Sequence, residues 1–585
     1  MKKIFGEISY IFNRKQKRNM ALLLVAIFIG AVFELLGVSL IMPLISVISS
    51  PEMIEENRYL NMAYRISGAN DSSSFFVFLA VLIIAVYIIK NIYLIVMYRF
   101  QYTFIYKNQL KVSGRLVDCY LRKPYTYHLN NNSSNMIRNI MLDTERLFQL
   151  ILSVLNCMSE ALLCLLLGLF MLVNDPFMTV SLAALLILCM GAYRIFTRER
   201  VNEYGRINQF YDGRMHQSIN QALGAVKDIK ILHREKYFVD RFVSSGEKKM
   251  NALINTNFFG TVPRYLIETV CVGGIILVLI IKLKTGTDLS QILPVLGSFA
   301  VAAFKLMPSA GKISNYANLI SFLTPSIDLI YKDIKETEDM IEKDVKDRGE
   351  LPDIEADAHS IRVENLTYSY PGSDEKVLKG ADFEIPLGAS VGLIGESGAG
   401  KSTMADVILG ILFPVEGRVM YGRMNVHDYP LKWAEKLAYI PQAIFLADES
   451  IRDNVAFGVE EDRIDDNKVW EALEEAQLAG FVRELPEGLD TLVGERGVRL
   501  SGGQRQRIGI ARALYDDPEI LVLDEATSAL DSDTESAVME AIDSLMGRKT
   551  LIIIAHRLTT IRNCQMIFKV ENGKLKRIEK EEIYS

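Results

Sequence analysis

The stretch "VGLIGESGAGKST", Val391–Thr403, decides how the second half of this chain folds. An apolar strand pattern leads into a glycine-rich turn, and a helix pattern starts at Lys401. Glycines let the backbone close around phosphate oxygens, and a helix N-terminus adds N–H donors and a positive dipole end. In this spacing the lysine reaches the β- and γ-phosphates of ATP, and the Ser402 hydroxyl ligates Mg²⁺. The candidate ATP-binding residues of the stretch are Gly395, Glu396, Ser397, Gly398, Ala399, Gly400, Lys401, Ser402 and Thr403.

An acidic pair ends a second strand pattern, in "ILVLDEATSALD", Ile520–Asp531. Four aliphatic residues precede Asp524 and Glu525, as in a buried strand. We predict that Asp524 holds Mg²⁺ through water and that Glu525 polarises the attacking water. Helix capping is the alternative role, but two carboxylates after four aliphatic residues are hard to explain by capping alone.

Three further positions follow or precede strand patterns. His556 ends the strand in "LIIIAHRLTT", where a histidine can contact the γ-phosphate, although a lone histidine there is more often structural. Gln442 in "YIPQAIF" is expected to sense the attacking water and to contribute to the Mg²⁺ site. Tyr370 in "YSYPG" is expected to stack its ring on adenine.

The stretch "LSGGQRQR", Leu500–Arg507, is a second helix start of the kind that faces an anion. Its small residues carry no acid, base or nucleophile chemistry of their own. The chain already has a phosphate cradle a hundred residues earlier. These residues therefore predict contact with a phosphate that this cradle does not hold.

The first half of the chain is apolar in long runs. The chain has 585 residues, of which 50% are hydrophobic, and it is too long for one compact core. A bilayer core takes roughly 20 residues of helix. Buried helices of a large soluble protein are the alternative, but so many runs before residue 315 argue against it. Six runs are long enough, near 19–46, 74–100, 146–173, 177–197, 257–283 and 289–315.

Basic residues predict the orientation of these spans. They gather before the first run, between the second and third, and between the fourth and fifth. The positive-inside rule therefore places the N-terminus and both long loops in the cytoplasm, and an even number of spans places the second half there too. Short helices are expected at the loop tips, 123–135 and 224–242. The acidic residues 331–357 indicate a helix tail and a solvated linker.

Several classes of function are excluded. A net charge of −6 gives no electrostatic footprint for nucleic acid. The six cysteines lack CxxC and CxxH spacing, which predicts neither a disulfide framework nor a cysteine metal site. The first apolar run is too long for a signal-peptide core, and no small-residue cleavage site follows it, so we expect no cleavable signal peptide.

The motifs from about residue 358 to 585 resemble the ATP-binding cassette family. They match its Walker A motif, Q-loop, LSGGQ signature, Walker B motif, D-loop at Ser528–Asp531 and His switch, while "VGERG" at Val493–Gly497 resembles the exporters' X-loop. The resemblance implies that the signature caps the ATP of a second copy. Because every catalytic position is filled, it implies a homodimer with two competent sites. The residues expected to reach the partner's ATP are Ser501, Gly502, Gly503 and Gln504.

Six spans ahead of one cassette resemble the half-transporter exporters. The expected fold class is a multidomain membrane protein, with an all-α six-helix transmembrane exporter domain followed by an α/β P-loop ATP-binding cassette domain. The predicted boundaries are 1–330 for the membrane domain, 331–357 for the linker and 358–585 for the nucleotide-binding domain. The loop tips would be coupling helices.

Charges inside the spans point to the substrate, because each is costly unless paired or hydrated. Basic residues on three spans suit an anionic ligand such as a pyrophosphate, although Arg99 and Arg264 could also snorkel, and Glu34 more often pairs structurally. The outer loop "ENRYLNMAYRISG" places apolar residues on one helical face, which could lie along the membrane surface; a short charged loop helix is the alternative. The candidate substrate residues are Arg99, Arg264, Lys305, Tyr59, Met62 and Ile66.

The stretches "ELLGVSLIMP", "PRYLIE" and "FKLMPS", with the outer helix, are similar to bacterial PglK-type flippases of lipid-linked oligosaccharides, which serve protein glycosylation. The resemblance implies ATP-driven flipping of a polyprenyl-pyrophosphate glycan from the cytoplasmic to the outer leaflet of the bacterial cell membrane. Lys305 stands where this family would have arginine, which weakens bidentate pyrophosphate binding. A general lipid, drug or peptide exporter and a non-transporting ATP switch remain open.

Overall fold

The computed structural model describes residues 2–40, 58–68, 71–174, 176–284, 289–347, 359–525, 532–555 and 557–584. Contacts divide the chain into two units. The first comprises Met1–Lys123 and Asn131–Ile341, and the second comprises Pro124–Asn130 and Glu342–Ser585.

The first unit is entirely helical in its described residues. Its long helices contain the apolar runs and continue beyond them; α6, for example, has 51 residues, far more than the roughly 20 that cross a bilayer. The helices are α1 (Lys2–Ile11), α2 (Arg14–Ser39), α5 (Arg58–Ser67), α6 (Ser72–Arg122), α8 (Ser133–Arg138), a π-helical turn (Asn139–Asp143), α9 (Thr144–Asn174), α10 (Pro176–Gly224), α11 (Val226–Leu232), α12 (Glu235–Lys284) and α13 (Leu289–Asp347).

Four helical segments among the described residues are long and apolar enough to cross a membrane: Arg14–Gly37, Ser73–Arg122, Ser133–Val173 and Thr179–Gly224. Four of the six predicted spans are therefore supported by helices of sufficient length and apolar character. The two remaining runs lie in the continuous helices α12 and α13, and their crossing of the membrane stays a prediction.

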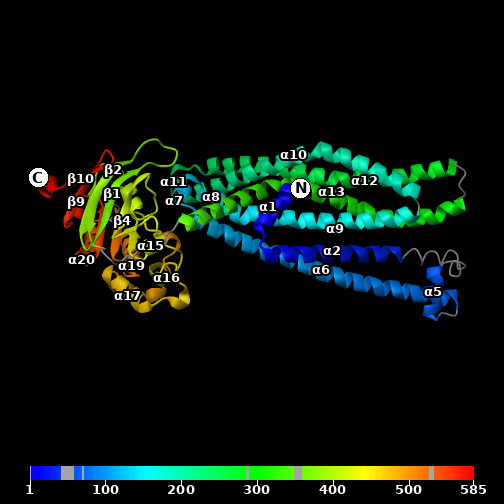
Figure 1. The fold of residues 1–585 in the computed structure, drawn as a ribbon, viewed down its shortest axis with the longest axis horizontal. Coiled ribbons are helices and arrows are strands. Elements are labelled where there is room, and N and C mark those ends of the chain that lie inside the picture. Colours follow the sequence, from blue (N-terminus) through cyan, green and yellow to red (C-terminus); the bar gives the residue numbers. More distant parts are fainter. Residues whose placement is uncertain are drawn as a thin grey trace. The chain divides into compact units, whose positions relative to one another are not determined.

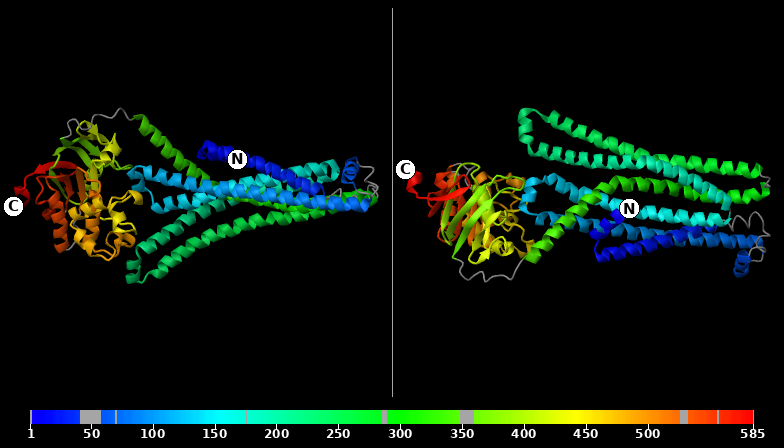
Figure 2. Two further views of the ribbon diagram at one scale, coloured as in Figure 1. Left: turned by 90° about the horizontal axis from the view of Figure 1, so that it is seen from below. Right: turned by 45° about the horizontal axis from the view of Figure 1, so that its top comes forward.

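The long helices pack side by side. Helix α2 packs against α6 and α9, and α10 pairs with α12 (Figure 1). The further views show α10 and α12 joined at one end by the short helix α11 (Figure 2). Asp71 caps the start of helix α6 by accepting a hydrogen bond from the Ser74 N–H. The helix ends at Arg122, shortly before Pro124, which disfavours helix at the preceding residue.

A buried network of ion pairs and hydrogen bonds joins five helices of the first unit. The π-helical turn ends at Asp143, which is 0% exposed. Its carboxylate lies 3.1 Å from both Arg138 and Arg146 and accepts a hydrogen bond from Ser326 of α13 at 2.8 Å. Arg146 also pairs with Asp212 of α10 at 2.7 Å, and Asp212 pairs with Lys249 of α12 at 2.6 Å.

Replacing Asp143 by alanine is expected to destabilise the helical unit by about 3–5 kcal/mol, because removing one partner of a buried ion pair leaves the others uncompensated. Thermal unfolding of the purified protein in detergent, followed with a thiol-reactive dye, measures the effect. Glu145→Ala changes an exposed carboxylate two residues away and serves as the control. Equal unfolding temperatures for the two variants would show that the network is not stabilising.

The second unit contains two sheets. An antiparallel sheet has the order β2-β1-β4-β5, and a six-stranded sheet has the order β10-β9-β3-β8-β7-β6. In the six-stranded sheet only β10 is antiparallel to its neighbour. The strands are β1 (Ser360–Tyr368), β2 (Leu378–Pro386), β3 (Ser390–Ile394), β4 (Glu416–Tyr421), β5 (Met424–Asn425), β6 (Leu437–Ile440), β7 (Ile520–Asp524), β8 (Thr550–Ile554), β9 (Met566–Glu571) and β10 (Lys574–Ile578).

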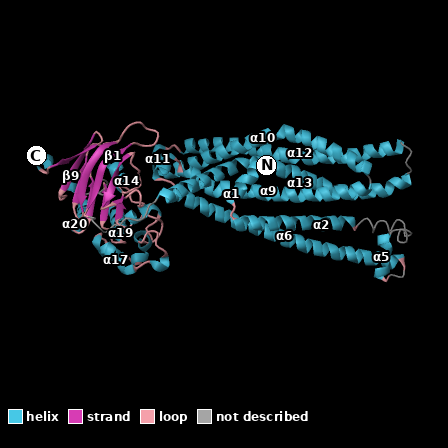
Figure 3. Ribbon diagram, viewed as in Figure 1, coloured by secondary structure: helices cyan, strands magenta, loops and turns pink. Residues whose placement is uncertain are grey.

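Helices accompany the strands of the second unit (Figure 3). The apolar strands β7 and β8 are buried, as strands of a parallel sheet covered on both faces are. This is the predicted α/β architecture. The helices are α7 (Tyr125–Asn130), α14 (Lys401–Ile408), α15 (Pro430–Ala434), α16 (Ile451–Val455), α17 (Asp466–Glu475), α18 (Ala479–Glu484), α19 (Gly502–Leu514), α20 (Ser532–Leu545) and α21 (Glu581–Tyr584), with short 3₁₀ turns between them.

Part of the predicted linker is helix. Helix α13 continues to Asp347, and its residues up to Ile341 group with the first unit. Residues 348–357 lie outside the described part of the chain. Short helices occur at both predicted loop tips, as α7 and α8 in the first and α11 in the second.

Candidate nucleotide site

Parallel strands bring the predicted catalytic positions to one edge of a sheet. The phosphate loop 395–400 follows β3, Gln442 follows β6, and Glu525 follows β7. Because β3, β6, β7 and β8 run parallel in one sheet, their carboxyl ends share an edge, where α/β folds bind ligands. His556 follows β8 in sequence but lies outside the described residues, as do the D-loop residues 528–531.

Glycine conformations shape the phosphate loop. Gly395 has φ 153° and Gly400 has φ 104°, values that side-chain-bearing residues rarely adopt. A Cβ at Gly395 would also strike the carbonyl oxygen of Val570. Lys401, 5% exposed, curls back over the loop and donates hydrogen bonds from Nζ to the carbonyl oxygens of Gly395 and Glu396, both at 2.9 Å.

Burial and two nearby carboxylates act on the charge of Lys401 in opposite directions. Burial lowers the pKa of its ammonium group, while Glu525 and Asp524 act in the opposite direction. The next residue, Ser402, is exposed in the first turn of α14, so its hydroxyl is accessible. A phosphate in the loop would replace the two carbonyls as acceptors for the lysine.

The two residues predicted to handle the attacking water are in contact. Gln442 donates a hydrogen bond from Nε2 to Oε2 of Glu525 at 2.6 Å. Glu525 has φ 47°, and its N–H bonds to the carbonyl oxygen of Ile554 in β8 at 3.0 Å. A left-handed backbone costs a non-glycine residue free energy and is common at functional sites. The turn that ends β7 thus holds the carboxylate beside Gln442.

Tyr370 lies next to the phosphate-loop helix. Its hydroxyl and that of Thr403 are 3.0 Å apart and hydrogen-bonded, and its ring meets Tyr368 edge to face at 5.1 Å. This contact fixes the tyrosine beside α14. Stacking on adenine stays a prediction.

Sequence reasoning missed one carboxylate of this region, Asp406 on α14. Burial, and secondarily Asp524, raises its pKa to about 6. Burial, with Asp524 and Asp406 nearby, also raises the pKa of Tyr439 on β6. The available sequence signal was a single acid within the apolar helix pattern that follows the phosphate loop.

Asp406→Asn is expected to stabilise the second unit at pH 7.5. Because the folded-state pKa lies above the ordinary value of 3.8, the folded protein keeps a proton that the unfolded chain releases between about pH 4 and 6, so wild-type stability falls as pH rises through that window. After allowance for solvent screening, the gain should be about 1–2 kcal/mol at pH 7.5 and vanish near pH 4.

Urea unfolding followed by tryptophan fluorescence measures this gain in the intact protein, because both tryptophans, Trp433 and Trp470, lie in the second unit. Asp428→Asn, a change of an aspartate in the same unit outside this cluster, is the control. A gain independent of pH would contradict the assigned cause.

The signature stretch, Leu500–Arg507, contains the N-cap of helix α19. The Ser501 hydroxyl accepts a hydrogen bond from the Gln504 N–H at 3.2 Å, and the Gln504 side chain accepts one from the Ser501 N–H at 2.8 Å. This reciprocal pair is a capping box, so Gln504 has a structural role in α19. Ser501 and Gly502 remain exposed.

Arg512, later in α19, holds the segment that follows Gln442. Its guanidinium donates at 2.8 Å to the carbonyl oxygens of both Asn454 and Phe445, and it lies 4.4 Å from the ring centroid of Phe457. The signature helix and the segment after Gln442 are therefore joined directly.

The predicted substrate residues lie in different surroundings. Arg99 is exposed on α6, whereas Arg264 lines a groove of 660 Å³ between α12 and α13. The second cation of that groove is Lys312, which the sequence analysis did not single out; the side chain of Lys305 lies outside the described residues. Glu34 pairs with Lys90 at 3.2 Å, as expected.

The outer helix is present as α5. Its residues Met62 and Ile66 are 63% and 72% exposed, whereas Tyr64 packs edge to face on Phe75. The helix therefore presents apolar side chains outward. The backbone of Tyr59 belongs to α5, but its side chain lies outside the described part of the structure.

Two family models match the chain: "ABC transporter" over residues 378–528 and "ABC transporter transmembrane region" over residues 19–287. HepA, the heterocyst differentiation ATP-binding protein of Nostoc sp., is 30% identical over 77% of this chain and 72% of its own length. The ATP-dependent lipid A-core flippase of Pseudoalteromonas translucida is 29% identical over 78% of this chain and 77% of its own length.

ABC transporter B family member 21 of Arabidopsis thaliana is 36% identical over 53% of this chain, which spans about a fifth of that longer relative, 22%. The solved structure of a bacterial Atm1-family ABC exporter with ATP bound superposes with a TM-score of 0.73 at 20% identity, covering 98% of this chain and 96% of that one. That likeness concerns the fold.

The chain belongs to the ABC transporter family. It is a half-transporter, in which one transmembrane region is fused to one ATP-binding domain. The second unit is accordingly the ATPase that drives transport through the first.

Proposed function

We propose that this protein is an ATP-driven flippase that moves an anionic, polyprenyl-pyrophosphate-linked glycan from the cytoplasmic to the outer leaflet of a bacterial cell membrane. The observation that carries the proposal is a groove with two cations, Arg264 and Lys312, and one carboxylate, Glu268, between two long helices of the transmembrane region. A relative named as a lipid A-core flippase, similar over most of both chains, supports a lipid substrate.

The hydrolysis step is assigned to residues at the sheet edge. Lys401 exchanges its two backbone acceptors for phosphate oxygens, and Glu525 accepts a proton from the attacking water that Gln442 helps to position. His556 contacts the γ-phosphate, and Tyr370 stacks on adenine.

The same edge fits Mg²⁺. Oxygen donors are the ligands that Mg²⁺ prefers, and the exposed Ser402 hydroxyl, Asp524 and Gln442 supply them beside a loop whose glycines leave room for phosphates. When bound, the ion neutralises charge on the β- and γ-phosphates.

The protein functions as a homodimer in this proposal. The exposed residues Ser501 and Gly502, with Gly503, contact the ATP held by the partner's phosphate loop, and Gln504 supports them through the capping box. Six spans place the N-terminus and the ATP-binding domain in the cytoplasm, following the distribution of basic residues.

The substrate head group is assigned to the groove between α12 and α13. Arg264 and Lys312 offer two cations, and Thr261 and Asn315 add polar groups. We further propose that Arg99 and Lys305 take part in binding the anionic substrate. The exposed apolar residues of α5 would contact the polyprenyl tail at the membrane surface.

The double variant Arg264→Gln, Lys312→Gln is expected to slow flipping of a pyrophosphate-linked lipid about a hundredfold or more, since each contact with a charged group is worth roughly 1.5–3 kcal/mol. Glutamine at 312 keeps a donor for Glu160. Basal ATPase activity should survive, because the ATP-binding domain is unchanged. Flipping in liposomes and ATPase activity are measured together.

Lys332→Gln is the control, because this side chain is 72% exposed and pairs with Glu336 in the next turn of α13. Normal flipping by the double variant would show that the groove does not bind the substrate. A general lipid, drug or peptide exporter would then be the better description.

A further inference from the structure

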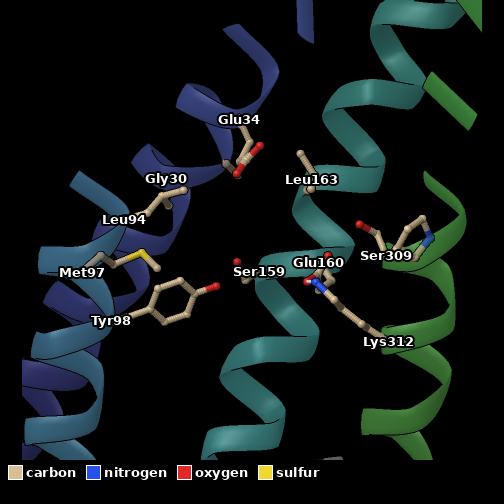
Figure 4. Close-up of a pocket in the computed structure, with 12 residues that line it drawn as sticks. Gly30, Glu34, Leu94, Met97, Tyr98, Ser159, Glu160, Leu163, Ser309 and Lys312 are labelled. Carbon is tan, nitrogen blue, oxygen red and sulfur yellow. Dashed lines mark hydrogen bonds and ion pairs between the residues drawn. The ribbon is translucent and has the colours of Figure 1, made fainter. Parts of the chain in front are cut away.

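A second cavity in the transmembrane region is lined by polar side chains. It has a volume of 280 Å³ and lies between α2, α6, α9 and α13 (Figure 4). Hydrophobic residues such as Leu94 and Leu163 complete its wall. The polar residues that line it are Glu34, Tyr98, Ser159, Glu160, Ser309 and Lys312.

Two polar groups of this cavity lack partners in the described part of the chain. Ser309 is 3% exposed, and its hydroxyl makes no hydrogen bond with another described residue. Glu160 accepts a hydrogen bond from Lys312 at Oε1, 2.7 Å away, while its Oε2 is buried without a partner. Buried polar atoms are normally paired, so the Glu160 Oε2 atom indicates a ligand or ordered water in this cavity. The hydroxyls of Ser309 and Tyr98 point into the shared space (Figure 4).

The charges around the cavity are balanced. Glu34 pairs with Lys90 at 3.2 Å, and Glu160 pairs with Lys312 at 2.7 Å. Each pair is neutral, so the cavity offers no net charge to attract a further charged group. An apolar chain would leave the unpaired acceptor of Glu160 unsatisfied. A neutral ligand rich in hydroxyl donors meets both conditions.

The volume and the position of the cavity indicate more closely which kind of ligand it binds. The volume is near the lower end for ligand pockets, about 300 Å³, so it suits one ring and not a lipid chain. Lys312 and Pro308 line both this cavity and the groove that contains Arg264. A ligand held by its phosphates at Arg264 and Lys312 therefore has this cavity beside it.

We propose that the cavity binds the first sugar ring of a glycosylated lipid whose phosphates lie in the groove, an inference that rests on the proposed function. The sugar hydroxyls donate to Glu160 and to Ser309. The cavity then makes the transporter select a sugar-bearing lipid over the same lipid without sugar. Selection occurs at the ring nearest the phosphates, whatever the rest of the glycan.

Native mass spectrometry of the purified protein with equal amounts of two lipids tests this selection. The probes are undecaprenyl pyrophosphate bearing one N-acetylhexosamine and undecaprenyl pyrophosphate alone. Wild type should favour the sugar-bearing lipid about tenfold or more, the effect of two or so hydrogen bonds. The double variant Glu160→Gln, Ser309→Ala should bring the ratio near one; because it also removes the charge paired with Lys312, binding of the bare lipid is measured separately.

Two further variants make the test specific. Ser159→Leu fills the cavity without altering charge and should also abolish the preference. Ser153→Ala is the matched control: Ser153 is likewise 3% exposed and lies on α9, but its hydroxyl bonds to the Gln149 carbonyl and does not line the cavity. It should leave the ratio as in wild type.

The outcomes separate this proposal from the proposed function. The sugar site is overturned if wild type binds both lipids without preference. It is also overturned if both cavity variants keep the wild-type preference. Either result leaves the proposed flippase function untouched. Equal loss of both lipids in the cavity variants overturns the sugar site as well. Binding of neither lipid by wild type overturns the proposed function itself.

Discussion

Glu525→Gln is expected to stop ATP turnover while ATP binding persists. Glutamine preserves the shape of the side chain and its contact with Gln442 but cannot accept a proton from the attacking water. Loss of a general base typically costs a factor of about 10²–10⁴ in rate. Phosphate release measures turnover, and binding of a fluorescent ATP analogue measures affinity.

The same variant should accumulate in an ATP-bound dimer, because the nucleotide is no longer consumed. Glu384→Gln, an exposed glutamate on β2 that bonds to Ser360, is the control and should hydrolyse ATP normally. Turnover by Glu525→Gln at the wild-type rate would refute the assignment of the catalytic base, and with it the significance of the 2.6 Å contact with Gln442.

Ser501→Arg is expected to abolish ATPase activity while leaving ATP binding at Lys401 intact. The substitution puts bulk and charge where the proposed partner presents its γ-phosphate. It also removes the cap of α19, a loss of about 0.5–2 kcal/mol. Ser501→Asn keeps a capping side chain without the bulk, so the stability of α19 and the contact with the partner can be judged separately.

Mixing two inactive chains tests the dimer directly. In a head-to-tail pair of Ser501→Arg with Lys401→Ala, one site receives both intact residues and the other receives neither. Random pairing gives half the dimers one intact site, so activity should return to about a quarter of wild type. Activity no higher than that of either variant alone would contradict the shared site.

The arrangement of the candidate nucleotide site was predictable because its signals are local. The glycine spacing of 395–400 specifies backbone conformations, and the aliphatic run before Asp524 specifies a buried strand. A parallel sheet then brings strand ends from β3, β6 and β7 together, although Lys401 and Glu525 are far apart in sequence. The 2.6 Å contact between Gln442 and Glu525 follows from that geometry.

The transmembrane site was less predictable because its chemistry depends on helix packing. Lys312 lies on a helix whose sequence also offers Lys305, and only the fold shows that Lys312 reaches both Arg264's groove and Glu160 on α9. The central position of Asp143 depends on a π-helical turn, which widens the helix and has no sequence pattern of its own. Such pairings require the three-dimensional arrangement of helices.

The most direct test of the central claim is ATP-driven lipid movement by the purified protein in liposomes. Undecaprenyl pyrophosphate bearing one sugar, labelled on the sugar, is incorporated into the membrane, and its appearance in the opposite leaflet is followed with and without ATP. We expect movement that requires ATP, is absent with Glu525→Gln, and exceeds that of an ordinary phospholipid. ATP hydrolysis at the wild-type rate without movement of the labelled lipid would contradict the account.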